Sequence, residues 1–270
     1  MAAPSNTKLR GGSTEEWDRV GARKSPSWYL DPLVAAQKKR VHQDLVWRWT
    51  RDVSIRRALK TDCFEEAHGD DGILFDLFPS ADAVGMDLAF STVRRAQSRR
   101  TDQRIRFLAG DVRCLALRPG CIDAIVSTST LDHFESRGEF ARAISELVGV
   151  LRPGGVLVIT LDNLRNPLYT PLRWASRRGW LPFRLGYTTT LSGLERCLRD
   201  AGLRVTATDA VIHNPRLLST LLFRALRWLL GRRADLPVRG LLAAFAALDR
   251  LPTRGFTACF VAACARKPEA

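Results

Sequence analysis

Apolar and polar positions along the chain follow two periods in turn. Five short apolar runs have the length of buried strands, near residues 56–61, 83–87, 104–110, 122–128 and 155–161. The wider spacing of amphipathic helices separates them, near 66–78, 91–99 and 138–151. Strands that alternate with helices in this way predict an α/β fold with a mostly parallel, doubly wound sheet.

Further segments extend this pattern at both ends. Asp31 followed by Pro32 is a typical helix start, a capping side chain before a proline at the first helical position, and predicts a helix to about Thr50. Its core side should carry Leu33, Val34, Val41, Leu45, Val46 and Trp49. Beyond the fifth strand, a helix at 191–201 that stops at Gly202 precedes a strand at 203–211.

Acidic residues stand where the second and third strands end. Asp87 closes the strand in Val84-Gly-Met-Asp-Leu88, and Asp111 follows the strand that ends in Leu108-Ala-Gly. In an open parallel sheet the carboxyl ends of the strands line the crevice where ligands bind. There the two oxygens of Asp87 can accept hydrogen bonds from both hydroxyls of a ribose. The alternative for either aspartate is a helix cap or a turn residue.

The order of these pieces resembles the class I S-adenosylmethionine-dependent methyltransferases that modify small molecules. The resemblance covers roughly residues 55–212 and rests on four segments, Val84–Leu88, Leu108–Val112, Ile122–Val126 and Leu147–Leu157. The last contains Leu151-Arg-Pro-Gly-Gly-Val, a helix-to-strand turn that the family places just before its fifth strand, Val156 to Leu161 here.

The resemblance has several implications. It implies a Rossmann-like sheet whose last strand, near 256–265, pairs antiparallel at the sheet edge, and S-adenosylmethionine as the cofactor. Asp87 would meet the ribose and Leu88 the cofactor, Asp111 the adenine amino group, and Val112 would supply a backbone N–H. Ser127, at the end of the fourth strand, would also contact the cofactor.

The loop after the first strand departs from the family, which normally carries a glycine-rich run there. This chain reads Ala58-Leu-Lys-Thr-Asp-Cys-Phe-Glu-Glu-Ala-His-Gly69, in which Gly69 alone remains. An acidic loop can still suit the cofactor, because its amino-acid end carries an ammonium and its sulfonium is positive. Asp62 or Glu65 could pair with either charge. Alternatively, Glu65 opens the next helix, where the helix dipole favours it.

Candidate acid–base residues follow the fourth strand, in Thr128-Ser-Thr-Leu-Asp-His-Phe134. Methyl transfer from a sulfonium depends mainly on placing the acceptor opposite the methyl group, and a base is needed only where the acceptor must lose a proton. His133 has a pKa suited to that task, and Asp132 could orient it or take the proton itself. The alternative is a polar turn with an Asp cap. Neither the histidines nor the cysteines show a metal-ligand spacing, so no metal is expected.

Two insertions interrupt the plan and should carry substrate specificity. Residues 163–190 are rich in aromatics, and residues 214–252 contain two leucine-rich runs that read as a helical hairpin. The runs are too short to span a bilayer. The hairpin could pack on the core, cap an apolar pocket or rest on an anionic membrane. Residues 164–254 hold 16 Arg, no Lys and 5 acidic residues, although Arg excess throughout the chain also indicates a coding bias.

Length and composition set the remaining expectations. The chain has 270 residues, 46% of them hydrophobic, which suffices for one large domain at 27–270 with the two insertions as a candidate substrate cap. Residues 1–26 lack apolar periodicity and predict a mobile arm. The absence of an apolar leader and six unpaired-looking cysteines favour the cytoplasm, with peripheral membrane contact as an addition.

Three functions remain open from the sequence, and a fourth is disfavoured. The first is methyl transfer to a small, hydrophobic or lipid-like acceptor, and the second is a non-catalytic methyltransferase-like binding protein, suggested by the missing glycines. An RNA methyltransferase would explain the net charge of +14, but no separate RNA-binding module is visible, so nucleic acid is a weak candidate partner. A nicotinamide dehydrogenase should show Gly-x-Gly-x-x-Gly after the first strand, and the chain does not.

Overall fold

The computed structural model describes residues 14–22, 31–69, 73–180 and 185–269. These residues form a seven-stranded sheet in the order β3-β2-β1-β4-β5-β7-β6. The strands are β1 (Arg57–Lys60), β2 (Asp82–Asp87), β3 (Ile105–Ala109), β4 (Ile122–Thr128), β5 (Leu151–Asp162), β6 (Arg204–Val211) and β7 (Phe260–Arg266). The first five run parallel, and β7 is antiparallel to both β5 and β6. The predicted doubly wound, mostly parallel sheet is confirmed.

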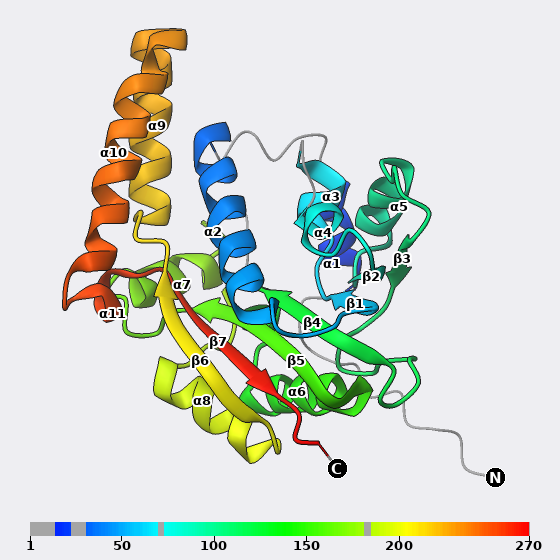
Figure 1. The fold of residues 1–270 in the computed structure, drawn as a ribbon. Coiled ribbons are helices and arrows are strands. Elements are labelled where there is room, and N and C mark those ends of the chain that lie inside the picture. The colour runs from blue at the N-terminus through cyan, green and yellow to red at the C-terminus, as the bar shows by residue number, and fades with distance from the viewer. Residues whose placement is uncertain (1–13, 23–30, 70–72, 181–184, 270) are drawn as a thin grey trace.

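Helices cover both faces of this sheet (Figure 1). In chain order the helices are α1 (Thr14–Gly21), α2 (Pro32–Thr50), α3 (Phe64–His68), α4 (Ile73–Leu77), α5 (Phe90–Ser98), η2 (Leu131–His133), α6 (Arg137–Val150), α7 (Tyr169–Arg177), α8 (Leu191–Asp200), α9 (Arg216–Leu230), η3 (Gly231–Ala234), α10 (Asp235–Ala247), η4 (Leu248–Arg250) and α11 (Arg254–Thr257). α6 and α8 lie on one face and α2 on the other, so the central strands are buried on both sides.

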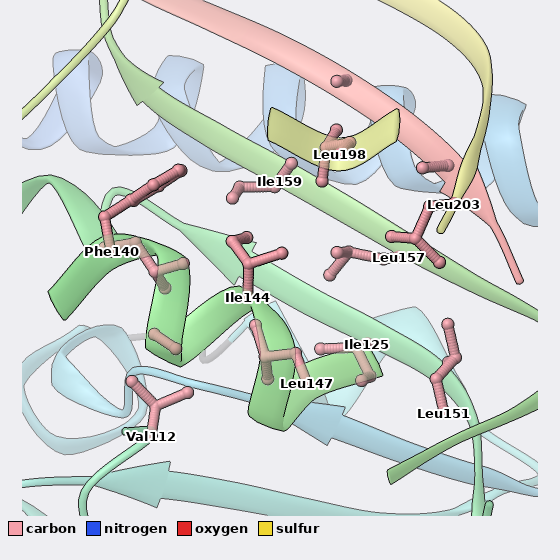
Figure 2. Packing of buried hydrophobic residues seen from close by; sticks show 14 of the residues in the cluster. Val112, Ile125, Phe140, Ile144, Leu147, Leu151, Leu157, Ile159, Leu198 and Leu203 are labelled. Carbon is pink, nitrogen blue, oxygen red and sulfur yellow. The ribbon is translucent and has the colours of Figure 1, made fainter. Parts of the chain in front are cut away.

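Alternate residues of the central strands supply the two cores. Ile125, Leu157 and Ile159 point towards α6, where they meet Phe140 and Ile144 (Figure 2). Their sequence neighbours, such as Val126, Val156 and Val158, pack against Leu45 and Val46 of α2 on the opposite face. This is the two-residue period of a strand, and burial on both faces explains why these strands read as continuous apolar runs.

Local signals fix the two long covering helices. The Asp31 carboxylate accepts a hydrogen bond from the Leu33 N–H at 2.9 Å and caps α2, which ends at Thr50 as predicted. Ser136 and Glu139 form a capping box at the start of α6. Each cap satisfies backbone donors that no helical carbonyl can reach.

Three element predictions need correction. The helix expected at 66–78 is instead two short helices, α3 and α4, and residues 70–72 between them lie outside the described range. β5 begins at Leu151 rather than Val156, because Leu151 pairs with Ile122 ahead of the turn that holds Gly154 at φ +70°. β7 begins at Phe260 and lies between β5 and β6, so β6 is the edge strand. Residues 256 and 257, assigned to that strand, belong to α11.

Part of the segment expected to be a mobile arm is helical. Residues 14–21 form α1, which lies against α5: the Ser91 N–H donates to the Asp18 carboxylate at 2.9 Å. The approach is close, since a Cβ on Gly21 would lie 2.4 Å from Thr92 Oγ1. Residues 1–13 and 23–26 of the predicted arm lie outside the described range. The arm prediction is therefore wrong for residues 14–21.

The insertion at 214–252 folds as the predicted helical hairpin. α9 and α10 stand side by side and extend away from the sheet (Figure 1). Phe223 of α9, Val238 and Leu242 of α10 and Val34 of α2 form a small core of their own. The hairpin is thus fastened to the start of α2. No helix in the described ranges is both long and apolar enough to cross a membrane.

Ile144 offers a test of the core under α6. Because its side chain is 1% exposed, Ile144→Ala should lower the free energy of unfolding by about 2–5 kcal/mol through lost burial and a cavity. Urea denaturation measures this change. Ser145→Ala, on the exposed side of the same helix, should change stability by less than about 0.5 kcal/mol. Equal losses in the two variants would contradict the packing in Figure 2.

Candidate functional site

The strand order reverses between β1 and β4, and open parallel sheets bind ligands at the carboxyl ends of the strands beside such a reversal. Strands with lower numbers continue on one side and β5 on the other, so the loops after β1 and β4 diverge. Hydroxyl groups join these two loops: Thr61 Oγ1 lies 2.9 Å from Ser127 Oγ and 3.1 Å from Thr130 Oγ1. Ser127 is fully buried by this contact. The predicted Ser127 therefore lies at the switch point, facing Thr61.

Asp87 ties the end of β2 to the loop after β1. One carboxylate oxygen accepts from the Cys63 N–H at 3.0 Å, and the other accepts from the Ala89 N–H at 2.8 Å. A carboxylate has about four acceptor positions, so two backbone donors leave room for two more hydrogen bonds. Leu88 follows directly, half-buried, before α5 begins. The sequence placed these two residues correctly at the strand end.

A fully buried lysine organises the loop after β1. The Lys60 ammonium donates to Glu66 at 2.8 Å and to Glu65 at 3.2 Å, and it also contacts the Asp62 carbonyl oxygen. Lys60 and Glu66 side chains are both 0% exposed. The second oxygen of Glu66 accepts from the Leu74 N–H at 2.8 Å, which holds α4 against α3. We call Lys60, Asp62, Glu65, Glu66 and Asp87 the acidic cluster.

The acidic cluster shifts the protonation of its members. Burial alone would lower the pKa of Lys60, but the charges of Glu66, Glu65 and Asp62 outweigh it and hold that pKa well above its ordinary value. Glu65 has its pKa lowered: burial opposes this, while Lys60 and Lys38 favour the charged form. Burial, then the charges of Glu65 and Asp87, raise the pKa of Asp62 well above its ordinary value. Burial also raises the pKa of Asp87.

Glu65 and Asp62 therefore differ as candidates for contacting a cation. Glu65 is already paired with two ammonium groups, Lys60 and Lys38, the latter at 3.4 Å. The Asp62 carboxylate accepts only the Phe64 N–H, at 2.7 Å, among the contacts of the described residues. A half-buried carboxylate with a raised pKa lacks a sufficient counter-charge. Of the two predicted residues, Asp62 is the one that a positive ligand group would stabilise.

Asp111 holds an arginine that the sequence reading overlooked. Arg113 Nε lies 3.0 Å from both Asp111 oxygens, and Nη2 lies 2.6 Å from one of them. Although burial opposes the change, these hydrogen bonds and the guanidinium charge lower the pKa of Asp111. Arg113 also pairs with Glu139 at the start of α6. The Val112 side chain is buried in the core (Figure 2), so any ligand contact of this residue would come from its backbone.

Asp132 and His133 form η2 just after β4, and they have different surroundings. Asp132 is buried, and its Oδ2 accepts from the Asp162 N–H at 2.8 Å and from Ser129 Oγ at 3.3 Å. These contacts join η2 to the end of β5. His133 is half-buried, and its ring centroid lies 4.9 Å from the ring centroid of Trp17 on α1. The geometry favours a positioning role for Asp132 over a proton-accepting one.

Part of the first insertion, residues 163–190, lies next to η2. Gly186 N–H donates to the Asp132 carbonyl oxygen at 2.8 Å, and Tyr187 N–H donates to that of Phe134. A Cβ on Gly186 would lie 2.1 Å from the Phe134 carbonyl oxygen, so only glycine permits the contact. Gly186 and Tyr187 consequently lie beside η2. Together with Trp17 of α1, they form part of the surroundings of His133.

Gly69 is the site residue that the sequence misplaced. It ends α3, one helical turn beyond the loop, where its N–H donates to the Glu65 carbonyl oxygen at 2.7 Å. Its φ of −74° is available to any residue, so it does not replace the family's glycine loop. The residues that shape the loop are Lys60, Thr61 and Cys63. A lysine at the end of an apolar strand with glutamates five and six residues on was the available signal.

Comparison with known proteins agrees with this geometry. Residues 70–159 match the family described as "Methyltransferase domain". An uncharacterised methyltransferase of Mycobacterium bovis is 32% identical over 125 residues, which span 44% of this chain and 61% of the relative. Residues 70–159 are thus similar to the methyltransferase domains of known proteins. A malonyl-[acyl-carrier protein] O-methyltransferase of Methylococcus capsulatus is 28% identical over 140 residues, 52% of this chain and 49% of that relative.

The chain thus spans less than two thirds of the length of these curated relatives. Among solved structures, the N-methyltransferase NodS of Bradyrhizobium japonicum in complex with S-adenosyl-L-homocysteine has a TM-score of 0.59 at 17% identity. The match covers 96% of this chain and 100% of NodS. At this identity the likeness shows the shared fold. The methyltransferase matches agree with the S-adenosylmethionine that the sequence predicts as cofactor.

Within the described ranges, no group of three or more His, Cys, Asp or Glu side chains is arranged to hold a metal ion. The site therefore consists of hydroxyl groups, the acidic cluster and η2.

Lys60→Met tests the acidic cluster. Removing the ammonium leaves Glu66 buried without its counter-charge, so the variant should lose about 3–5 kcal/mol of unfolding free energy in urea denaturation. Lys38→Met is the matched control, because that lysine also pairs with Glu65 but is 29% exposed, and it should cost less than about 1 kcal/mol. If both variants were equally stable, the cluster would not be the anchor of the loop.

Asp62→Asn tests the raised pKa. Because the folded-state pKa lies above the unfolded value, the ligand-free protein loses stability as pH rises from the ordinary Asp range through the raised pKa. Asn keeps the acceptor for Phe64 N–H without the charge. At neutral pH its Tm should therefore exceed wild type, by roughly 2–4 °C for each kcal/mol relieved, with the difference shrinking towards about pH 4. A lower Tm at neutral pH would contradict the assignment.

Proposed function

We propose that this methyltransferase transfers a methyl group from S-adenosylmethionine to a small, hydrophobic or lipid-like acceptor. One observation carries the proposal: the acidic cluster has more negative than positive charge. Asp62, Glu65, Glu66 and Asp87 face two ammonium groups, those of Lys60 and Lys38. A cofactor with an ammonium and a sulfonium would supply the missing positive charge.

The cluster residues take separate roles in this proposal. Asp87 would accept the ribose hydroxyls with its two remaining acceptor positions. Asp62 would face the positive end of the cofactor, and Lys60 would hold the loop in place while Glu65 stays paired with it. Asp111 would meet the adenine amino group with an orientation fixed by Arg113, and Val112 would donate its N–H. Ser127 and Thr61 would line the crevice between them.

When bound, S-adenosylmethionine supplies an electrophilic methyl group for in-line displacement. The chain's part is to position the acceptor and to remove its proton where it has one. His133 would accept that proton, since an imidazole nitrogen can act as a general base. Asp132 would keep η2 in place through its hydrogen bond to Asp162 N–H.

The acceptor side of the proposal rests on the surroundings of His133. Trp17 of α1 lies against its ring, and Gly186 and Tyr187 of the first insertion lie beside η2. Of these groups, the Trp17 ring would present an apolar surface to the acceptor. We infer that residues 27–270 act as one methyltransferase domain in which residues 163–190 and 214–252 form the substrate cap. The Methylococcus relative is named for an acyl-carrier-bound acceptor, which is compatible with an acyl-like substrate here.

A non-catalytic binding protein is the second candidate, because the loop after β1 lacks the family's glycines. The two functions differ in turnover. Tritiated methyl transfer to a panel of fatty acyl, isoprenoid and phenolic acceptors would support the enzyme. Tight cofactor binding without turnover across that panel would favour the binding protein.

Asp87→Ala is the direct test of the cofactor site. Losing the acceptor for two ribose hydroxyls should weaken S-adenosylmethionine binding by at least about 10-fold in titration calorimetry, since each such bond contributes roughly 1.5–3 kcal/mol. Asp82→Ala is the control, because Asp82 begins the same strand at the opposite end and is exposed. Unchanged affinity in folded Asp87→Ala would remove the assigned site.

In parallel, Asp62→Asn should weaken the binding of S-adenosylmethionine more than the binding of adenosine, because adenosine lacks the positive end.

A further inference from the structure

Apolar side chains gather at the tip of the α9–α10 hairpin, away from any core. We define the hairpin tip as residues 228–236, which join the two helices and lie farthest from the sheet (Figure 1). Trp228 is 84% exposed, Leu229 66% and Leu236 81%. Such exposure is unusual for large apolar residues in a contiguous segment and marks an interaction surface.

The exposed stripe continues down the outer side of α9. Leu218, Leu221 and Leu222 are also exposed and share a face with Leu229 at helical spacing. The opposite side of α9 is already occupied, because Phe223 is buried in the small core with Val34, Val238 and Leu242. α9 therefore has two apolar faces, of which the structure buries one.

Ion pairs of Arg227 attach the hairpin to the start of α2 and join α9 to α10. Arg227 Nε lies 2.8 Å from Asp31 Oδ2 at the start of α2, and its Nη1 pairs with Asp235 at the start of α10. The hairpin is thus tied both to itself and to the body of the protein. It presents the tip as a fixed feature.

The charge around the tip is positive. Arg224, Arg232, Arg233 and Arg239 are exposed and form no ion pair among the described residues. The acidic residue of the tip, Asp235, is engaged by Arg227. Free guanidinium groups therefore flank the exposed Trp228 and Leu229.

We propose that the hairpin tip docks on an anionic lipid surface, with Trp228, Leu229 and Leu236 in the interface and the free arginines on lipid phosphates. Tryptophan with leucine suits the boundary between head groups and acyl chains, and arginine keeps its head group at phosphate level while its stem contacts apolar groups. No described helix can cross a bilayer, so the contact is with the surface.

Charge favours lipid over a second copy of this chain. Two such faces brought together would place free arginines of both copies near one another without a matching acidic patch on the hairpin. An anionic bilayer instead supplies phosphates for the arginines and an apolar layer for the leucines. The docking needs neither cofactor nor acceptor, so it can be tested apart from methyl transfer.

Flotation with vesicles gives the first measurement, on the full-length protein without cofactor. The protein should float with phosphatidylcholine vesicles that contain about a third phosphatidylglycerol, float little with pure phosphatidylcholine, and dissociate as salt is added. Four substitutions to Gln at the free arginines, Arg224, Arg232, Arg233 and Arg239, should weaken binding by at least about 10-fold, because each arginine near such a surface contributes roughly fivefold.

A matched control removes the same charge elsewhere. Substitution to Gln at four exposed arginines of the main body should leave most of the binding intact, at Arg106, Arg118, Arg137 and Arg196. Equal losses in the two variants would show general attraction of a basic protein and overturn the tip as the docking site. Absence of wild-type flotation at low salt would also overturn it.

Insertion of the apolar residues needs a second readout. The fluorescence difference between wild type and Trp228→Phe should shift to the blue on anionic vesicles and be quenched by brominated acyl chains. Trp228→Ser with Leu229→Ser should lose binding while keeping the Tm of wild type, since both side chains are exposed. A stable dimer in sedimentation velocity that this variant abolishes would assign the face to a second copy and overturn the lipid proposal.

Discussion

The buried ammonium of Lys60 is the interaction on which the candidate site depends. It stands at the end of β1, next to the point where the strand order reverses, and it pairs with Glu65 and with the fully buried Glu66. Through Glu66 it also holds α4, and through the loop it sets the Cys63 N–H against Asp87. An ion pair thus shapes a loop that glycines shape in most of the family.

This substitution has a physical consequence for the ligand. A glycine loop offers backbone donors and space, whereas the acidic cluster offers negative charge in partly buried surroundings. The raised pKa of Asp62 expresses an unfavourable charge in the ligand-free protein, which a cationic group would relieve. Residues at functional sites commonly lower the free energy of unfolding of the ligand-free protein. The same loop can therefore be less stable alone and selective for a positive ligand.

The two insertions place different chemistry around the same sheet. Gly186 and Tyr187 of the first insertion lie beside η2 through backbone hydrogen bonds, so they belong to the surroundings of His133. The α9–α10 hairpin is instead fastened to α2 and extends away from the sheet with an apolar, arginine-rich tip. α1, which a lack of apolar periodicity had assigned to an arm, adds Trp17 beside η2.

The sequence alone determined the α/β class, most strands within a few residues, and α2 with its Asp31 cap. It also determined the hairpin and the positions of Asp87 and Asp111. All of these follow from periodicity, capping and strand ends, which are local properties of the chain. The tertiary structure alone decided the place of β7 inside the sheet, the pairing of Lys60 with Glu66 and the hydrogen bonds of Arg113 to Asp111. It also decided the position of Gly69 at the end of α3, beyond the loop after β1. Each of these depends on which side chains or strands meet across the fold, and pairing partners distant in sequence leave no periodic signal in the chain.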